Sequence, residues 1–238
     1  MEATAEPLGR QAHFGREVKT LAEARRQFAR KRSPWMILGA ILIAAVARLL
    51  LGDFTWVDAA AIGVMLVVYP FGEWAIHVYI LHMKPFRVRG KVIEPPAARD
   101  HRAHHEQPND LTMILLDPKE LSQLLFLAVP AVVGMGALVV AVVSEPLPIG
   151  AAVSAALAGY VAIFVYEWTH FLIHTAHRPR SRYYMAIWRN HRLHHFKNEH
   201  YWHGITNNVS DRVLGTNPGA RDIAKSHTAR TLDPGPTG

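Results

Sequence analysis

Histidines are the residues of this sequence best suited to chemistry, because there are 15 of them and ten fall into four short clusters. The clusters read HVYILH, HRAHH, HFLIH and HRLHH. Imidazole nitrogens bind iron, zinc, copper and nickel, and side chains three or four residues apart share one face of a helix. We therefore predict a metal centre whose ligands are His77, His82, His101, His104, His105, His170, His174, His191, His194 and His195.

The spacing inside each cluster indicates where its rings point. On a helix, HRAHH and HRLHH can each aim three imidazoles in one direction, and HFLIH can aim two. HVYILH has a spacing of five, so His77 and His82 diverge on an α-helix and either address two different ions or bracket one site. Ten neutral imidazoles are too many for one ion, and we expect two ions with about four or five nitrogen ligands each. The spacing leaves the identity of the metal open.

Polar side chains beside the clusters are candidates for a supporting role. A metal-bound histidine usually donates its second ring N–H to a carboxylate or a carbonyl. A carboxylate at a membrane boundary is costly unless it is paired, which favours the two glutamates that precede the first and third clusters. The four candidates are Glu73, Glu167, Asp100 and Asn190.

Apolar runs flank the clusters and must bring them together. Hydrophobic residues make up 50% of the chain, and long apolar runs alternate with basic, histidine-rich stretches, as in a membrane protein with polar loops. The 65 residues from the second cluster to the third are enough for a helical hairpin that crosses the bilayer and returns. We predict four spans, with a kink at Pro130 in the third: Trp35–Leu51, Val57–His82, Leu121–Val143 and Pro148–His174.

Lysine and arginine residues gather on one side of these spans. Of the 26, eight precede residue 35, seven lie between residues 84 and 119, ten follow residue 175, and the last is Arg48. Because such residues mark the cytosolic side, we expect both termini, the middle loop and every histidine cluster to be cytosolic. We expect a multi-pass protein of the cell membrane in a bacterium, or of the endoplasmic reticulum in a eukaryote. The net charge of +7 is also typical of nucleic-acid binding, but the apolar runs favour a membrane surface and no nucleic acid as partner.

Composition divides the chain into three parts. We predict a basic cytosolic segment over residues 1–33, the membrane domain over residues 34–217 and a flexible tail over residues 218–238. The first apolar run begins at Trp35, so we expect the first span, rather than a cleaved signal, to insert the chain. Val18–Arg32 predicts a short basic helix that either lies on the membrane surface or belongs to a solvated positive tail. The apolar side of that helix would carry Val18, Leu21, Ala24 and Phe28.

Taken together, the four clusters resemble the histidine boxes of the fatty acid hydroxylase and sterol desaturase superfamily, and most of all its fatty acid 2-hydroxylase branch. The resemblance covers about residues 70–217 and rests on GEWAIHVYILHMKP, DHRAHHEQPND, YEWTHFLIH and NHRLHHFKNEHYWHGITNNVSDRVLGT. It implies an all-helical membrane fold, with four transmembrane helices and a cytosolic helical cap. It also implies two iron ions bound by the ten histidines, with zinc as a substitute at the same nitrogens.

The same resemblance implies O2-dependent hydroxylation of a lipid acyl chain, such as 2-hydroxylation of a fatty acid or sphingolipid. Many relatives carry a fused cytochrome b5 domain, and this sequence shows no such segment. We therefore expect a separate electron-donor protein, either cytochrome b5-like or a ferredoxin.

Other functions are weighed against this one. A desaturase, or a sterol or carotenoid hydroxylase, of the same superfamily would use the same metal site. A membrane metal transporter would need ligands along a pathway at mid-bilayer, whereas these clusters lie at one face. A zinc hydrolase uses three protein ligands and a nearby general base, which ten imidazoles without a carboxylate ligand fit poorly. The absence of cysteine excludes disulfides, iron–sulfur clusters and thiol nucleophiles.

Overall fold

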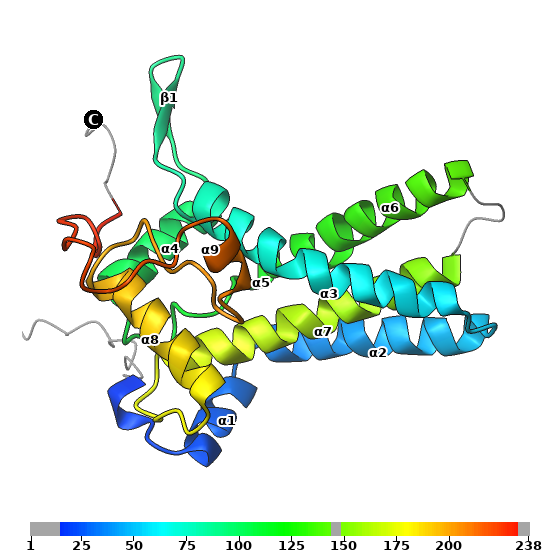
Figure 1. Cartoon of the computed structure of the whole chain (residues 1–238), viewed down its shortest axis with the longest axis horizontal. Coiled ribbons are helices and arrows are strands. Elements are labelled where there is room, and N and C mark those ends of the chain that lie inside the picture. The colour runs from blue at the N-terminus through cyan, green and yellow to red at the C-terminus, as the bar shows by residue number, and fades with distance from the viewer. Residues whose placement is uncertain (1–14, 144–148, 233–238) are drawn as a thin grey trace, which may run out of the picture.

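The computed structural model describes residues 15–143 and 149–232, and these are mostly helical (Figure 1). Long helices run side by side toward one end of the molecule, and shorter helices and loops form a cap at the other end (Figure 1). The predicted fold class, an all-helical membrane protein with four spans and a cap, is confirmed apart from one short β-hairpin. The four segments long and apolar enough to cross a membrane are Ser33–Leu51, Trp56–Leu81, Pro118–Ala137 and Ile149–Ile173.

The first two spans are the helices α2 (Ser33–Leu51) and α3 (Trp56–Ile76), which are joined by a tight turn. Proline in the first turn of α2 has no N–H to leave unsatisfied, so the helix starts there without a side-chain cap. In α3, a capping box between Thr55 and Asp58 satisfies the first N–H groups. Both helices therefore start within two residues of the predicted positions.

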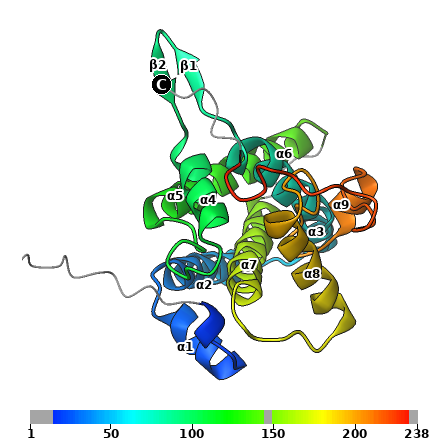
Figure 2. The same ribbon diagram turned by 90° about the vertical axis from the view of Figure 1, so that its left-hand side faces the viewer.

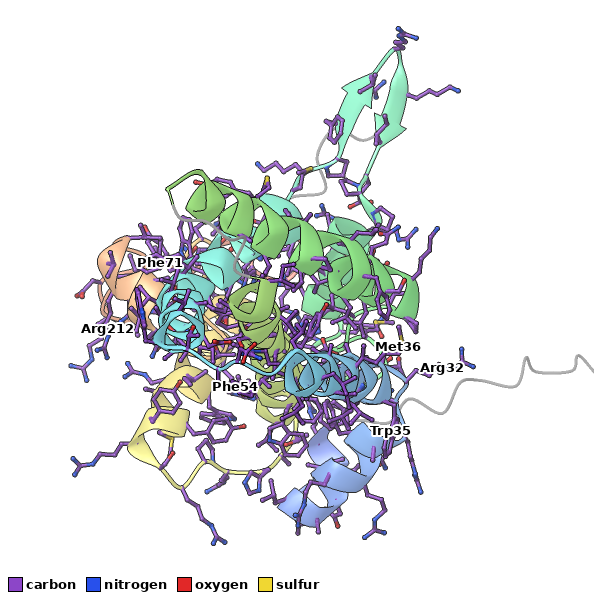
Figure 3. The ribbon with its side chains drawn as sticks, turned by 90° about the vertical axis from the view of Figure 1, so that its right-hand side faces the viewer. Arg32, Trp35, Met36, Phe54, Phe71 and Arg212 are labelled. Atoms are coloured by element: carbon purple, nitrogen blue, oxygen red, sulfur yellow. The ribbon has the colours of Figure 1, made fainter. Side chains whose placement is uncertain are left out.

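A buried ion pair holds the spans together at the end remote from the cap. Arg48 of α2 donates to Asp58 of α3 at 2.7 Å and to Ser154 of α7 (Ile149–Ile173) at 3.0 Å. Its guanidinium also stacks 3.7 Å from the ring centre of Phe54, which lies in the turn between α2 and α3 (Figure 3). Three helices are thus joined at a place where an unpaired charge would be costly.

The third span is interrupted where the sequence predicts a kink. It consists of α5 (Pro118–Gln123), the π-helical turn η3 (Leu124–Ala128) and α6 (Val129–Val143). Pro130 has no N–H and its ring clashes with the carbonyl one turn earlier, and the wider π turn directly before it absorbs this conflict. Figure 1 shows α6 diverging from α7 beyond this point.

The N-terminal helix α1 (Leu21–Ala29) forms within the predicted range, and most of its apolar side packs against the rest of the chain. Val18, Ala24 and Phe28 are buried against other parts of the chain, including Phe171 of α7. The rings of Phe28 and Phe171 are 5.4 Å apart. The alternative of a solvated positive tail is therefore wrong for this helix, because α7 offers its apolar side a protein partner, and its location at the membrane surface stays a prediction.

The cap contains the remaining elements. A β-hairpin, β1 (Phe86–Val88) paired antiparallel with β2 (Lys91–Ile93), projects away from the helices (Figure 2). It is followed by α4 (Pro96–Glu106), and the C-terminal part of the chain adds α8 (Arg182–Phe196) and the short α9 (Val209–Val213). A 3₁₀ turn, η1 (Gly15–Glu17), and the π-helical turn η2 (His77–Leu81) that continues α3 complete the fold.

Loops complete the cap after α9. Residues up to Leu232 pack against α4, with Ala229 and Leu232 buried. Arg102 of α4 donates to the carbonyls of Thr231 at 2.7 Å and Leu232 at 2.6 Å. We predicted that residues 218–238 are flexible, which is a statement about motion, and it stays a prediction. Residues 233–238 lie outside the described part of the chain.

Candidate metal centre

The ten candidate histidines, which lie far apart in the sequence, form two groups of five. Within each group the potential ligand nitrogens all lie within 4.8 Å of one another. The first group contains His77, His82, His101, His105 and His194. The second group contains His104, His170, His174, His191 and His195.

The two histidines of HVYILH join the same group because their helix changes type. Residues His77–Leu81 form a π turn, in which the N–H of His82 donates to the carbonyl of His77 at 3.1 Å. A π turn returns to the same face after about five residues, so the two rings lie 4.9 Å apart rather than diverging. Of the two alternatives that the spacing leaves open, the structure favours a shared site.

The two HxxHH motifs divide their rings between the groups instead of aiming all three in one direction. On α4, His101 and His105 belong to the first group and His104 to the second. On α8 the division is reversed, with His194 in the first group and two rings in the second. The rings of His105 and His195, one from each group, are only 4.0 Å apart. Each of the two helices thus supplies ligands to both of two adjacent sites.

The nitrogens that meet in each group lack hydrogen-bond partners. In the first group all five Nε2 atoms are buried and unpartnered. In the second, Nε2 of His174 and Nε2 of His195 each lie 3.0 Å from Nε2 of His191, although one ring nitrogen can supply only one proton. Buried polar atoms without a hydrogen-bond partner are rare in such numbers unless a ligand binds them. Lone pairs that converge on one point suit a cation. The residues present therefore suit a transition metal in each group.

Burial keeps these rings in the form that binds metal. Burial lowers the pKa of His105 to about 4 and that of His174 to about 3, against the smaller opposing effect of a backbone hydrogen bond to each ring. Burial and neighbouring histidines also lower the pKa of His194 and His195 well below the ordinary value. Neutral imidazoles need lose no proton when a metal binds.

Backbone carbonyls hold several rings in place. The Nδ1–H of His77 donates to the carbonyl of His203 at 2.7 Å, and that of His194 to Tyr201 at 2.8 Å. The remaining two bonds run from His105 to the Ala229 carbonyl at 2.9 Å and from His174 to the Pro108 carbonyl at 2.7 Å. Each bond places the proton on Nδ1 and leaves Nε2 free for a metal. Sequence reasoning misses these anchors, because a main-chain carbonyl has no signature in the sequence.

Residues 62–216, which include every one of these histidines, match the fatty acid hydroxylase family. The chain belongs to this family. It is also 28% identical over 163 residues to a dihydroceramide fatty acyl 2-hydroxylase of Arabidopsis thaliana, an alignment that covers 68% of this chain. The aligned part spans 64% of that protein's length. No solved structure matches the chain.

Within the part that matches the fatty acid hydroxylase family, Glu73 and Asp211 support the site by fixing a loop rather than a ring. Glu73 accepts the N–H groups of Ile205 at 2.5 Å and Thr206 at 2.9 Å, and the hydroxyl of Thr206. Asp211 accepts the N–H groups of His203 at 3.0 Å and of the residue after it at 2.7 Å. Burial acts to raise the pKa of Asp211, but these bonds and one from Thr216 outweigh it and lower the pKa. The two carboxylates thereby position the carbonyl that holds His77.

The other predicted supporting residues lie in different places. Glu167, next to the third box, accepts the hydroxyl of Ser33 and the N–H of Leu116, so it ties α7 to α2 and to the segment before α5. Asn190 of α8 donates to Asn217 at 2.8 Å and so holds the chain after α9. Asp100 is exposed and pairs with Arg99 at 2.9 Å. In the described structure, none of the three forms a hydrogen bond to one of the ten rings.

Proposed function

We propose that this chain is an oxygenase that hydroxylates the acyl chain of a membrane lipid, at the carbon next to the carbonyl. The observation that carries the proposal is the pair of adjacent all-histidine groups at the end of four apolar helices, in a chain of the fatty acid hydroxylase family. The activity for which the plant relative is named supports the choice of carbon and of a sphingolipid or fatty acyl substrate.

The ten histidines would hold two iron ions, one in each group. Bound iron supplies the activation of O2 and the cleavage of an unactivated C–H bond, which no protein side chain provides. The overall reaction consumes one C–H bond, one O2, two electrons and two protons, and yields one alcohol and one water. Zinc would occupy the same nitrogens but has no redox chemistry, so a zinc-loaded sample should be inactive.

The chain's own residues would bind, orient and exclude water. The carbonyl anchors fix the rings, and the burial of the ligand nitrogens keeps solvent from the reacting atoms. Because two of the histidine pairs lie at or directly after the ends of α3 and α7, an acyl chain would reach the metals from the bilayer without leaving it entirely.

We also propose a cytosolic location for both termini, the middle loop and the metal centre. Support comes from the 25 Lys and Arg residues other than Arg48, none of which falls in the connections at residues 52–56 and 144–147 that would face the opposite side. On this side a separate, soluble electron-transfer protein would deliver the two electrons of each turnover.

Lipid analysis after labelling with ¹⁸O2 tests the proposal. Membranes containing the iron-loaded chain, an acyl lipid, a reductant and labelled O2 should yield a 2-hydroxy acyl product that carries the label. A product with a new double bond and no added oxygen would instead identify a desaturase. An iron-loaded, reduced and folded sample that gives neither product would contradict the proposal.

A further inference from the structure

A pocket of about 620 Å³ opens beside the second histidine group. Its walls come from η1, from the loop that follows α7, and from α8. Three of its lining residues are arginines, Arg16, Arg178 and Arg192, and none of its lining residues is acidic. All three arginines are exposed to solvent. Figure 2 shows α1 and α8 on the side of the molecule opposite the β1–β2 hairpin, so this pocket and the hairpin face different ways.

The positive charge of this pocket is not balanced from within the chain. In the described part of the chain, none of the three arginines forms a salt bridge. The stretch between Glu167 and Glu199 contains six Arg and Lys residues and no Asp or Glu. An acidic partner would supply the balancing anion.

The pocket also reaches the metal centre, through His174. Nε2 of this ring lies among the second group, and Nδ1 donates to the carbonyl of Pro108. Both nitrogens are therefore committed, and the pocket meets the outer side of a ligand. From this pocket, the ring of His174 would block a substrate C–H bond from reaching a metal. An electron, in contrast, can pass through an imidazole ring.

We propose that this arginine-lined pocket is the docking site of the electron donor, a small soluble protein whose redox group is surrounded by carboxylates. The inference rests on the proposed function, since only a redox reaction needs a donor. Each turnover takes two electrons, delivered as two one-electron transfers from two reduced donor molecules, which are thereby oxidised. His174, whose ring lines the pocket, would carry the electrons toward the metals that the histidines would hold, and the two protons would come from solvent.

Binding measured without turnover tests this docking site. The full chain is held in nanodiscs of neutral phosphatidylcholine, and the probes are the soluble domain of a cytochrome b5 and a plant-type ferredoxin, both acidic. The test variant reverses two charges at the pocket, Arg16→Glu with Arg178→Glu. The matched control reverses two charges on the hairpin, Arg89→Glu with Lys91→Glu. Metal content and thermal stability are recorded for each sample.

The proposal expects at least one probe to bind the native chain with an affinity that falls steeply as salt rises. The pocket variant should bind that probe roughly tenfold or more weakly, while the hairpin control stays within about twofold. Salt-independent binding of the native chain, or equal losses in the two variants, would overturn the docking site, and the salt series does so even if the pocket variant fails to fold. In a parallel series with phosphatidylserine added to the nanodiscs, a pocket variant that loses bound anionic lipid but keeps its donor affinity would also overturn it, and would assign the pocket to a lipid headgroup.

The two proposals fail in distinguishable ways. Hydroxylation of the lipid by the native, iron-loaded chain with a chemical reductant needs no donor protein, so its absence counts against the oxygenase alone. Product formed with the chemical reductant, together with donor binding that ignores Arg16 and Arg178, counts against the docking site alone.

Discussion

The two histidine groups are built from the same side chain but are held by different parts of the molecule. In the first group, three rings are anchored to carbonyls of loops that follow α8: His77 to His203, His194 to Tyr201 and His105 to Ala229. In the second group, Nδ1 of His191 and Nδ1 of His195 have no hydrogen-bond partner in the described structure. The first group therefore relies mainly on carbonyls of loops after α8, whereas the second has one such anchor, from His174 to Pro108, and otherwise relies on the packing of α4, α7 and α8.

Because the two groups are held differently, a substitution can disturb one metal site without the other. A change in a loop after α8 should disturb one metal and leave the other in place. A change that shifts or rotates a helix carrying rings of both groups should disturb both.

Removing one ligand from either group should abolish activity. His194→Ala removes a ligand of the first group and His104→Ala one of the second. Each variant is expected to lose the metal of its own group and to form no detectable hydroxylated lipid, because both metals are needed for O2 activation. Metal analysis and lipid mass spectrometry check this, with the exposed His227→Ala as control. Native activity in either variant would remove that histidine from the metal centre.

Weakening the loop that holds His77 should lower metal affinity in the first group only. Asp211→Asn replaces one acceptor oxygen by an NH2 group, so the N–H of His203 or of Gly204 loses its partner. We expect metal binding about 10–100-fold weaker in the first group, as for other changes behind a ligand. Chelator competition measures it, with Asp117→Asn, at the start of α5, as the matched control. Equal losses from both groups would show that the two sites are not independently held.

Removing the C-terminal loop should have a smaller effect in the same direction. A chain that ends at Ile223 lacks the Ala229 carbonyl that holds His105. It also lacks Ser226 and Thr228, whose hydroxyls bond the buried Glu199 at 3.0 and 2.5 Å. We expect about tenfold weaker metal binding in the first group. A chain that ends at Leu232 keeps these contacts and serves as control. Unchanged affinity in the shorter chain would mean that His105 needs no anchor.

Breaking the ion pair at the opposite end should affect neither group. Arg48→Met leaves Asp58 and Ser154 without their shared partner. We expect the midpoint of thermal denaturation to fall by roughly 10 °C, with metal content unchanged. Arg89→Met, in the exposed turn of the hairpin, is the control. Loss of metal at a temperature where the variant is still folded would show that the two ends of the molecule are coupled.

The sequence was sufficient for much of the fold and for the identity of the clustered residues. Hydropathy places the four spans to within a few residues, because each must bury a long apolar run in lipid. The histidine boxes name the ten rings that meet, since imidazoles at helical spacing share a face. The packing of α1 against α7 was not foreseen, because composition alone does not say which apolar surface a helix will meet.

How the rings divide between the groups could not be predicted. The division follows from how α4 and α8 are rotated against each other and from the π turn at His77, both of which are tertiary features. The supporting contacts were also out of reach, because carbonyls such as those of Tyr201 and Ala229 are present at every position of every chain. Glu73 was singled out as a candidate partner of a metal-bound ring, whereas its carboxylate accepts backbone N–H groups about 130 residues away in the sequence.

The π turn has a consequence for how such boxes are compared between proteins. A π turn takes up about one residue more than an α turn before returning to the same face. A chain with HxxxH on an ordinary α-helix and this chain with HVYILH can therefore present the same two nitrogens in the same way. An insertion or deletion of one residue at this position is then a change of helix type, and it carries no information about which reaction the metals perform.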